Sequence, residues 1–362
     1  YKSIMQSRDN IMSSKPIQRI IFGSPGTGKS YMIDDKIIPN ELNIDIKKNP
    51  ENIIKAVFHP EYTHGDFMGK LLPMTQDGQV EYNFYEGHFL SALSQAYKNI
   101  LATYDRQENK IEGKEIENVV LVIDEINRGN SSAIFGSIFQ LLDRDDDGWS
   151  SYTTSINGVM FIKLLELLDG GDFSKKKGDI THLSIPPFNN SSIEKLQEKL
   201  KFLNFDLINK TIKIPPNLSI VATMNTSDSS IYYMDSAFKR RWDWEFIDID
   251  SNPVKSIGTA FNTRVDWDRF IGKLNLFIKN NHSYIRGIED KQVGKYFIKD
   301  EVVSKSVIQS KLMFFIWDSV FTRDKKPLLD LLNIKNKNEL ITFGDFAKKV
   351  DSFIEKVESY NV

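Results

Sequence analysis

The chain has 362 residues, 40% of them hydrophobic, which is enough for about two domains that each bury a substantial core. Its 47 basic and 49 acidic side chains give a net charge of −2, which argues against a strongly basic nucleic-acid-binding domain. Cysteine is absent and no apolar run approaches the ~20 residues of a membrane span, which excludes a disulfide framework and favours a cytoplasmic protein without a membrane partner.

A phosphate-binding loop follows a polar lead-in (residues 1–15). The apolar run Ile20–Phe22 predicts a buried strand, and a predicted helix begins at Tyr31. The loop lies between them, and it matches G-x-x-x-x-G-K-[ST] with Gly23, Ser24, Pro25, Gly26, Thr27, Gly28, Lys29 and Ser30. The glycines let backbone N–H groups surround phosphate oxygens, Lys29 faces the outer phosphates, and Ser30 offers a hydroxyl to Mg²⁺. The loop and Tyr31 are therefore the predicted nucleotide-binding set, and a chance glycine-rich turn is the alternative.

Two carboxylates follow the next strongly apolar strand. Ala56–Phe58 predicts an earlier strand and Gly87–Ile100 a helix, whereas Val119–Ile123 is apolar at every position, as in a parallel sheet covered on both faces. Asp124 and Glu125 come next, at the carboxyl edge where such sheets bind ligands. We assign Asp124 to the Mg²⁺ shell, through water, and Glu125 to the base that activates the attacking water. The alternative is a solvated strand end.

A third apolar strand, Leu218–Met224, ends in an amide. We expect that amide, Asn225, to hold the attacking water or the γ-phosphate from the neighbouring strand, and Asp228 follows it closely. Arg240 and Arg241 come later, and an arginine supplied across a subunit boundary can neutralise charge in phosphoryl transfer. A basic helix end near a C-terminal dipole is the alternative for this pair.

The hydrophobic pattern divides the chain in two. Alternating strands and helices over residues 16–250 predict an α/β domain whose parallel sheet is covered by helices. From 251 to 362 apolar residues recur at helical spacing, which predicts a helical domain. Within the first domain, residues from about 148 to 212 form a longer connection than expected. We interpret it as an insertion and hypothesise that a partner docks on it.

These motifs, in this order, resemble an AAA+ ATPase module. Finer matches resemble McrB-like proteins, the GTP-driven subunits of modification-dependent restriction systems. Ile123–Asn130 resembles the IDEINRAN stretch of that family, and Met224–Asp228 is similar to its MNxxD motif. Asp235–Trp242 resembles its segment of Asp, Ala and paired arginines, and Phe58–Phe67 resembles its FHxSYxYEDF stretch. The resemblance covers most of residues 16–250.

The resemblance implies a P-loop core followed by a smaller helical lid, assembled as a hexameric ring with nucleotide between subunits. It implies that Asn225 and Asp228 position the hydrolytic water and that Arg240 or Arg241 acts in trans. It also implies GTP as the substrate, a McrC-like nuclease subunit as partner, and DNA contacted through the assembled complex. We identify no convincing Asp and Glu-x-Lys nuclease constellation in this chain, so we expect another subunit to cut.

The chain also departs from the family pattern. It has Ser229–Ser230 where relatives carry Arg-Ser, and 22 residues precede the phosphate loop, so we expect either a fragment or recognition of DNA by another chain. The alternative function is an ATP-driven MoxR-like factor that remodels proteins, because the AAA+ core is shared. A non-hydrolysing scaffold is a third possibility, and the intact Lys29, Asp124 and Glu125 argue against it.

Overall fold

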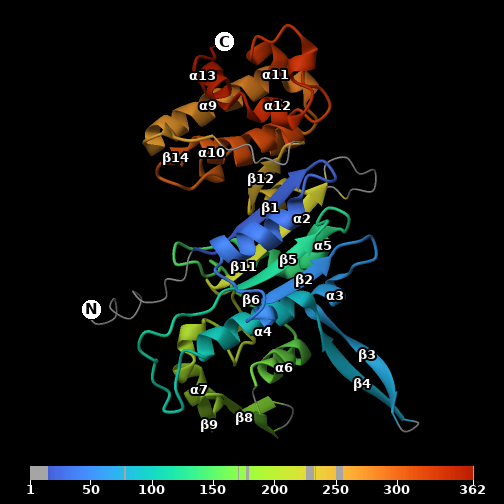
Figure 1. Ribbon diagram of the computed structural model, residues 1–362, viewed down its shortest axis with the longest axis vertical. Coiled ribbons are helices and arrows are strands. Elements are labelled where there is room, and N and C mark those ends of the chain that lie inside the picture. Colours follow the sequence, from blue (N-terminus) through green and yellow to red (C-terminus); the bar gives the residue numbers. More distant parts are fainter. Residues whose placement is uncertain are drawn as a thin grey trace. The chain divides into compact units, whose positions relative to one another are not determined.

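The computed structural model describes residues 15–76, 79–169, 171–176, 179–225, 232, 234–249 and 256–361. Its central feature is a five-stranded sheet in the order β12-β1-β11-β5-β2 (Figure 1). The pairs β1–β12, β11–β5 and β5–β2 are parallel. The strands are β1 (Gln18–Gly23), β2 (Ile53–Val57), β5 (Val119–Asp124), β11 (Leu218–Asn225) and β12 (Asp243–Ile247). The predicted α/β class is confirmed.

The strands β5 and β11 are apolar because both of their faces are covered. Every residue of β5 before Asp124 is buried, and so is every residue of β11 before Asn225. Helix α4 (His88–Leu101) packs against β2 and β5. The helix predicted over Gly87–Ile100 is confirmed, and its Leu93 and Tyr97 are fully buried there. Burial on both sides explains why these strands lack the alternation of a half-exposed sheet.

The chain divides into two compact units. Unit 1 holds the described residues of Tyr1–Gln18, Ser30–Met224 and Asp228–Met234, and unit 2 holds those of Arg19–Lys29, Asn225–Ser227 and Asp235–Val362. The predicted boundaries at 15/16 and 250/251 stay predictions. Among the helices in the described ranges, none has the length and apolar character needed to cross a membrane.

Unit 1 contains β2, β5, most of β11 and the following smaller elements. Its helices are α2 (Lys29–Met32, from Ser30 onward), a π-helical stretch (Ile33–Glu41), α3 (His64–Met68), α4, α5 (Ser131–Phe135), α6 (Gly158–Leu167) and α7 (Ile193–Lys199), with 3₁₀ turns at Pro50–Asn52, Gly136–Leu142 and Lys201–Leu203. Its further strands are β3 (Gly69–Gln76), β4 (Gln79–Glu86), β6 (Thr154–Ser155), β7 (Gly171–Lys176), β8 (Asp179–Ile185), β9 (Phe188–Ser192) and β10 (Thr211–Ile212).

Unit 2 contains β1, β12 and the predominantly helical remainder. Its helices are α8 (Ser236–Lys239), α9 (Arg264–Asn280), α10 (Lys305–Val307), α11 (Lys326–Leu331), α12 (Phe343–Ala347) and α13 (Val350–Glu358), with π-helical stretches at Ile308–Met313 and Ile316–Val320. Short strands β13 (Thr259–Phe261) and β14 (Val303–Ser304) pair, and 3₁₀ turns lie at His282–Tyr284, Ile288–Lys291, Lys295–Phe297 and Lys337–Glu339. The predicted helical stripes are confirmed, and they bury residues such as Phe270, Leu312 and Phe353.

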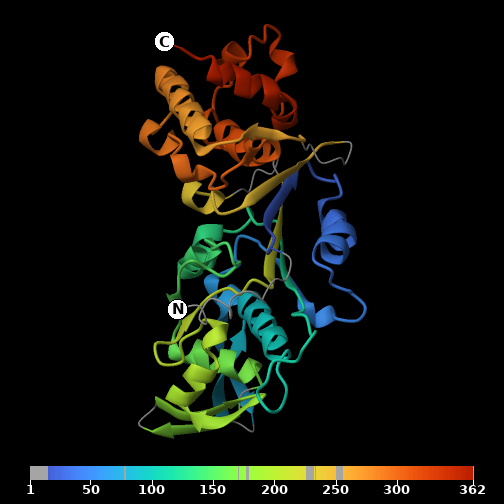
Figure 2. The same cartoon turned by 90° about the vertical axis from the view of Figure 1, so that its left-hand side faces the viewer.

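Two antiparallel elements of unit 1 differ from the predicted organisation. The first is a hairpin of β3 and β4 (Figure 1), and the second is a small sheet of β7, β8 and β9 within the 148–212 segment (Figure 2). The hairpin does have a sequence signal, because Asp77-Gly78 separates two runs that contain β-forming residues. Its strands expose apolar side chains instead of burying one face, so hydrophobic periodicity does not reveal it.

Arg144 is a half-buried cation held by main-chain carbonyl groups. Its guanidinium donates to the oxygens of Gly148 (2.8 Å), Ile214 (3.2 Å), Pro215 (3.1 Å) and Leu218 (2.8 Å). Burial lowers the pKa of Arg144 to about 9, so the group is still cationic at neutral pH. These bonds connect the acidic turn around Arg144 to the beginning of β11.

Replacing Arg144 with methionine should lower the free energy of unfolding by about 2–4 kcal/mol, because buried carbonyl oxygens lose their donors. Arg144→Lys should cost less, since an ammonium group still donates to some of these oxygens. Urea unfolding followed by circular dichroism measures both variants. A wild-type stability for Arg144→Met would show that these bonds do not stabilise the fold.

Candidate nucleotide-binding and hydrolysis site

The phosphate loop curls around its own lysine. Lys29 is only 7% exposed, and its Nζ donates to the carbonyl oxygens of Gly23 (3.2 Å) and Ser24 (2.8 Å). Thr27 is also buried, and its Oγ1 donates to the Ser24 oxygen at 3.0 Å. The cation is therefore placed inside the curve of the loop, where a phosphate group would lie next to it.

Glycine is required at three points of this loop. Gly26 and Gly28 have φ values of +80° and +79°, which side-chain-bearing residues rarely adopt. Gly23 is constrained by space, because a Cβ atom there would lie 2.4 Å from the carbonyl oxygen of Ile247. Ser24, Pro25, Gly26, Gly28 and Ser30 are exposed, as is the predicted contact Tyr31. The loop thus presents its backbone to solvent and keeps its lysine within.

A buried threonine joins the positions predicted to bind metal and to support hydrolysis. Ser30 Oγ, directly after the loop lysine, lies 3.4 Å from Asp124 Oδ1. Thr223 on β11 is 2% exposed, and its hydroxyl donates to the same Asp124 oxygen at 3.0 Å. The Thr223 oxygen also accepts the backbone N–H of Glu125 at 3.1 Å. One hydroxyl therefore holds both Asp124 and Glu125 at the carboxyl end of β5.

Glu125 occupies a constrained turn directly after its strand. Its φ of +55° lies in the left-handed region, which costs a non-glycine residue about 1–2 kcal/mol. The next residue keeps the turn in place, because Ile126 N–H donates to the Thr223 carbonyl at 3.0 Å. The Arg128 N–H then donates to the Glu125 carbonyl at 2.9 Å. Such strain at a half-buried carboxylate is typical of a functional position.

The remaining predicted residues are less closely determined. Asn225 is half-buried at the end of β11, and Asp228 lies outside the described residues. Arg240 is exposed, whereas Arg241 donates to the carbonyl oxygen of Ala237 at 2.7 Å. That bond is the contact expected of a basic residue at a helix end. The catalytic roles of all four residues stay predictions.

The segment after β2 continues the sheet edge beside Asp124. Val57 pairs in register with Asp124, and the Phe58 N–H donates to the Asp124 carbonyl at 2.9 Å. Gly129 lies against this segment, because a Cβ atom there would be 3.2 Å from the His59 carbonyl oxygen. The segments Phe58–Tyr62 and Ile126–Asn130 are therefore neighbours in unit 1.

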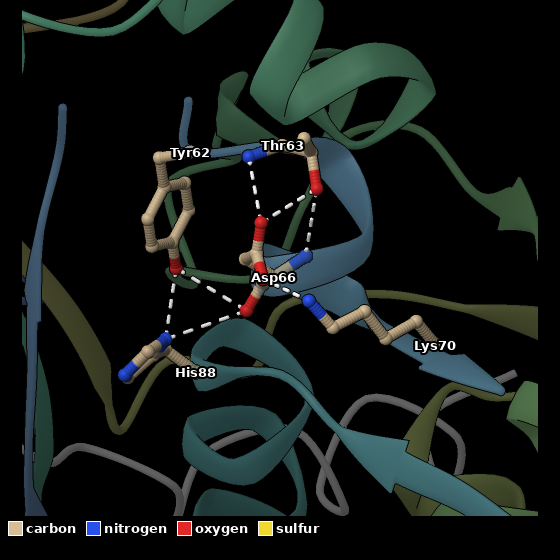
Figure 3. A network of polar contacts seen from close by, with 5 residues as sticks. All are labelled: Tyr62, Thr63, Asp66, Lys70 and His88. Carbon is tan, nitrogen blue, oxygen red and sulfur yellow. Dashed lines mark hydrogen bonds and ion pairs between the residues drawn. The ribbon is translucent and has the colours of Figure 1, made fainter. Parts of the chain in front are cut away.

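A polar network fixes the next turn (Figure 3). Thr63 and Asp66 form a capping box at the start of α3, and Asp66 Oδ1 pairs with Lys70 Nζ at 2.6 Å. The Tyr62 hydroxyl lies 2.8 Å from Nδ1 of His88. Partial burial raises the pKa of Asp66, but bonds from Lys70 and Thr63 outweigh it and lower the pKa to about 2. Burial, with the Asp66 charge, raises the pKa of Tyr62.

Thr223 is the residue of the candidate site that sequence reasoning missed. Its signal is a hydroxyl within a mostly apolar strand, directly before the Met224-Asn225 pair, and Ser219 in the same strand carries a hydroxyl as well. Such a threonine is equally compatible with a strand-forming residue that has no chemical role. Its significance depends on the parallel register, which pairs Ala222 with Ile123 and so brings Thr223 opposite the carboxylates.

Comparison with known proteins gives two curated relatives, and no protein-family model matches the chain. The type II restriction enzyme BsuMI component YdiS of Bacillus subtilis (strain 168) is 26% identical over 374 residues, which cover 95% of this chain and 90% of that protein. The type IV methyl-directed restriction enzyme EcoKMcrB subunit of Escherichia coli (strain K12) is 24% identical over 233 residues, which cover 64% of this chain and 35% of that protein.

The two similarities agree with the site. The phosphate loop, the Ser30–Asp124 contact and the strained Glu125 are the features expected of a nucleotide hydrolase. The chain is therefore related to McrB-like restriction-system proteins, and its core is an α/β phosphate-loop NTPase module of the AAA+ type.

Proposed function

We propose that the chain hydrolyses a nucleoside triphosphate, GTP in preference to ATP, as the motor subunit of a restriction system. The observation that carries this proposal is the hydroxyl of Thr223, which holds Asp124 and Glu125 together beside Ser30. Structural packing alone does not require a phosphate-loop hydroxyl, a carboxylate and a strained glutamate at one sheet edge. The preference for GTP rests on the family resemblance, because a phosphate loop does not contact the purine.

The residues of the site fit Mg²⁺ and phosphate. Ser30 and Asp124 offer the hard oxygen donors that Mg²⁺ takes, and such ions usually share few protein ligands with water and substrate phosphates. Within the described part of the chain, no cluster of three or more His, Asp or Glu side chains forms a metal site of its own. When bound, Mg²⁺ would neutralise phosphate charge. Lys29 would contact the outer phosphates, and Glu125 would take a proton from the attacking water.

The proposal extends to the assembly. Asn225 and Asp228 would position the water, and Arg240 or Arg241 would reach the nucleotide of a neighbouring subunit in a hexameric ring. The relatives are named as a component and a subunit of restriction enzymes. By analogy, a McrC-like nuclease subunit would bind this motor in the cytoplasm, and DNA would be contacted through the complex.

Steady-state hydrolysis of GTP and ATP by the purified chain, with and without Mg²⁺, tests the function. Mg²⁺-dependent turnover with a clear GTP preference is the expected result. A preference for ATP, together with remodelling of a protein client without DNA, would favour the MoxR-like alternative. Binding of both nucleotides without turnover, even when the chain is assembled, would contradict the assignment as a motor.

Glu125→Gln should reduce the turnover number by about 10²–10⁴-fold, because the general base is lost while the side-chain shape is kept. Nucleotide affinity should change little, since the phosphate loop is intact. A single-turnover assay and a binding assay with a fluorescent nucleotide separate the two effects. Glu115→Gln, at an exposed acid before the same strand, is the matched control and should behave as wild type. Unchanged turnover in Glu125→Gln would disprove the assignment of the base.

Thr223→Val should lower turnover by about 10–100-fold, because the half-buried Asp124 carboxylate and the Glu125 N–H lose one shared partner worth about 1–3 kcal/mol. Thr223→Ser should restore most of the activity, since it returns the hydroxyl. The concentration of Mg²⁺ needed for half-maximal rate should rise in Thr223→Val alone. Equal Mg²⁺ dependence in wild type, Thr223→Val and Thr223→Ser would show that Thr223 contributes only to packing.

A further inference from the structure

The β3–β4 hairpin is an exposed two-stranded ribbon (Figure 1). Within the described residues its strands join no larger sheet. Leu71, Val80 and Tyr82 expose 53%, 61% and 70% of their surface. A two-stranded ribbon is at best marginally stable in water, and an exposed strand edge readily pairs with another chain. The distal part of this hairpin therefore has the character of an incomplete sheet.

The two edges of the hairpin differ because of one proline. Pro73 of β3 pairs with Tyr82 of β4. Proline has no N–H to donate, so its place in a ladder is a pair whose main-chain groups point outward. Because this direction alternates along a strand, the main-chain groups of Val80, Tyr82 and Phe84 point outward on β4. Those of Thr75 point outward on β3. The β3 edge lacks a donor in its middle, whereas the β4 edge keeps its donors.

The length of the connection between β3 and β4 also predicts which residues of β4 direct their main-chain groups outward. Gln76 pairs with Gln79 across two residues, and the residues that flank a loop of this length exchange both hydrogen bonds. The direction of the main-chain N–H and C=O groups alternates along the strand, so those of Val80 and Tyr82 point outward and those of Glu81 point toward β3. The open edge of β4 thus follows from two independent features of the chain.

This edge is complementary to itself in an antiparallel pairing centred on Tyr82. Tyr82 would then face its own counterpart, and Val80 would face Phe84 on the same side of the sheet. Pairs of aromatic and β-branched residues across strands stabilise sheets. On the other side Glu81 would face Asn83, so the pairing brings no like charges together.

The charges of the hairpin do not favour nucleic acid as the occupant. Lys70 is engaged by Asp66 at 2.6 Å, and Glu86 is engaged by Lys163 at 3.4 Å. Glu81, the acid in the middle of β4, is exposed. An apolar edge with an exposed acid suits a protein strand, whereas a phosphate backbone requires cations.

We propose that β4 pairs with β4 of a second copy of this chain, which joins two hairpins into one four-stranded antiparallel sheet. The pairing is isologous, as in most two-fold contacts between identical chains. The base of the hairpin is already held by the ion pairs of Lys70 with Asp66 and of Glu86 with Lys163, and α6 packs against β4 there, so the contact uses the distal residues from Val80 to Phe84. The nucleotide-binding loop takes no part in it.

Val80→Pro and Thr75→Pro form a matched pair of variants, because the two residues face each other in the same rung of the ladder. Each proline removes one outward N–H and no bond within the hairpin, but only Val80→Pro alters the β4 edge. Analytical ultracentrifugation of the full chain, without nucleotide, is run over a concentration series. Wild type and Thr75→Pro should form particles of twice the Val80→Pro mass, because Val80→Pro should raise the dissociation constant of the pair about tenfold or more.

Amide hydrogen exchange by NMR provides a second readout on the wild-type chain. The outward N–H groups of Tyr82 and Phe84 should exchange slowly in the associated state and faster on dilution, whereas those of Glu81 and Asn83 should not change. Equal masses for wild type and Val80→Pro at every concentration, or dilution-independent exchange at Tyr82, would overturn the proposal. Neither measurement depends on nucleotide hydrolysis. A chain that does not associate could still be the proposed motor, and a chain without hydrolytic activity could still associate through β4.

Discussion

The hydroxyl of Thr223 is the contact on which the arrangement of the acids at the carboxyl end of β5 depends. A buried hydroxyl is costly unless its hydrogen-bonding capacity is used, and here both the proton and a lone pair are used. Its proton orients the carboxylate of Asp124, and its lone pair holds the backbone of Glu125 in a left-handed turn. A single side chain on one strand thereby sets the positions of two acids on the next.

Other buried polar groups hold the opposite end of the same strand pair. Asn217, just before β11, donates to the carbonyl oxygens of Ala96 and Glu117 at 3.0 Å, and its own carbonyl accepts the N–H of Val119. Arg144 binds the chain on the other side of the strand start. The register of β5 against β11 is thus determined at both ends. A slip of one residue would reverse which faces the side chains occupy and would separate the threonine from the carboxylates.

The hairpin follows a different physical principle. The central strands bury both faces, but the β3–β4 ribbon exposes apolar side chains on both faces, and its base is held by the ion pairs of Lys70 with Asp66 and of Glu86 with Lys163. That base follows Phe58, whose N–H extends the ladder to Asp124. The hairpin and the carboxylates that follow β5 therefore belong to the same compact unit of the chain.

The sequence by itself determined those features that depend on short-range residue patterns. The phosphate loop, the acids after an apolar strand and the helical stripes of residues 251–362 depend on short-range geometry, and the structure places them in the expected elements. Only the tertiary structure decided that Thr223 bonds Asp124, 99 residues away, that Arg144 lies among carbonyl groups, and that β3 and β4 form a separate two-stranded ribbon. The physical reason is that a residue's own neighbours set its backbone conformation, whereas its burial and its hydrogen-bond partners come from segments far along the chain.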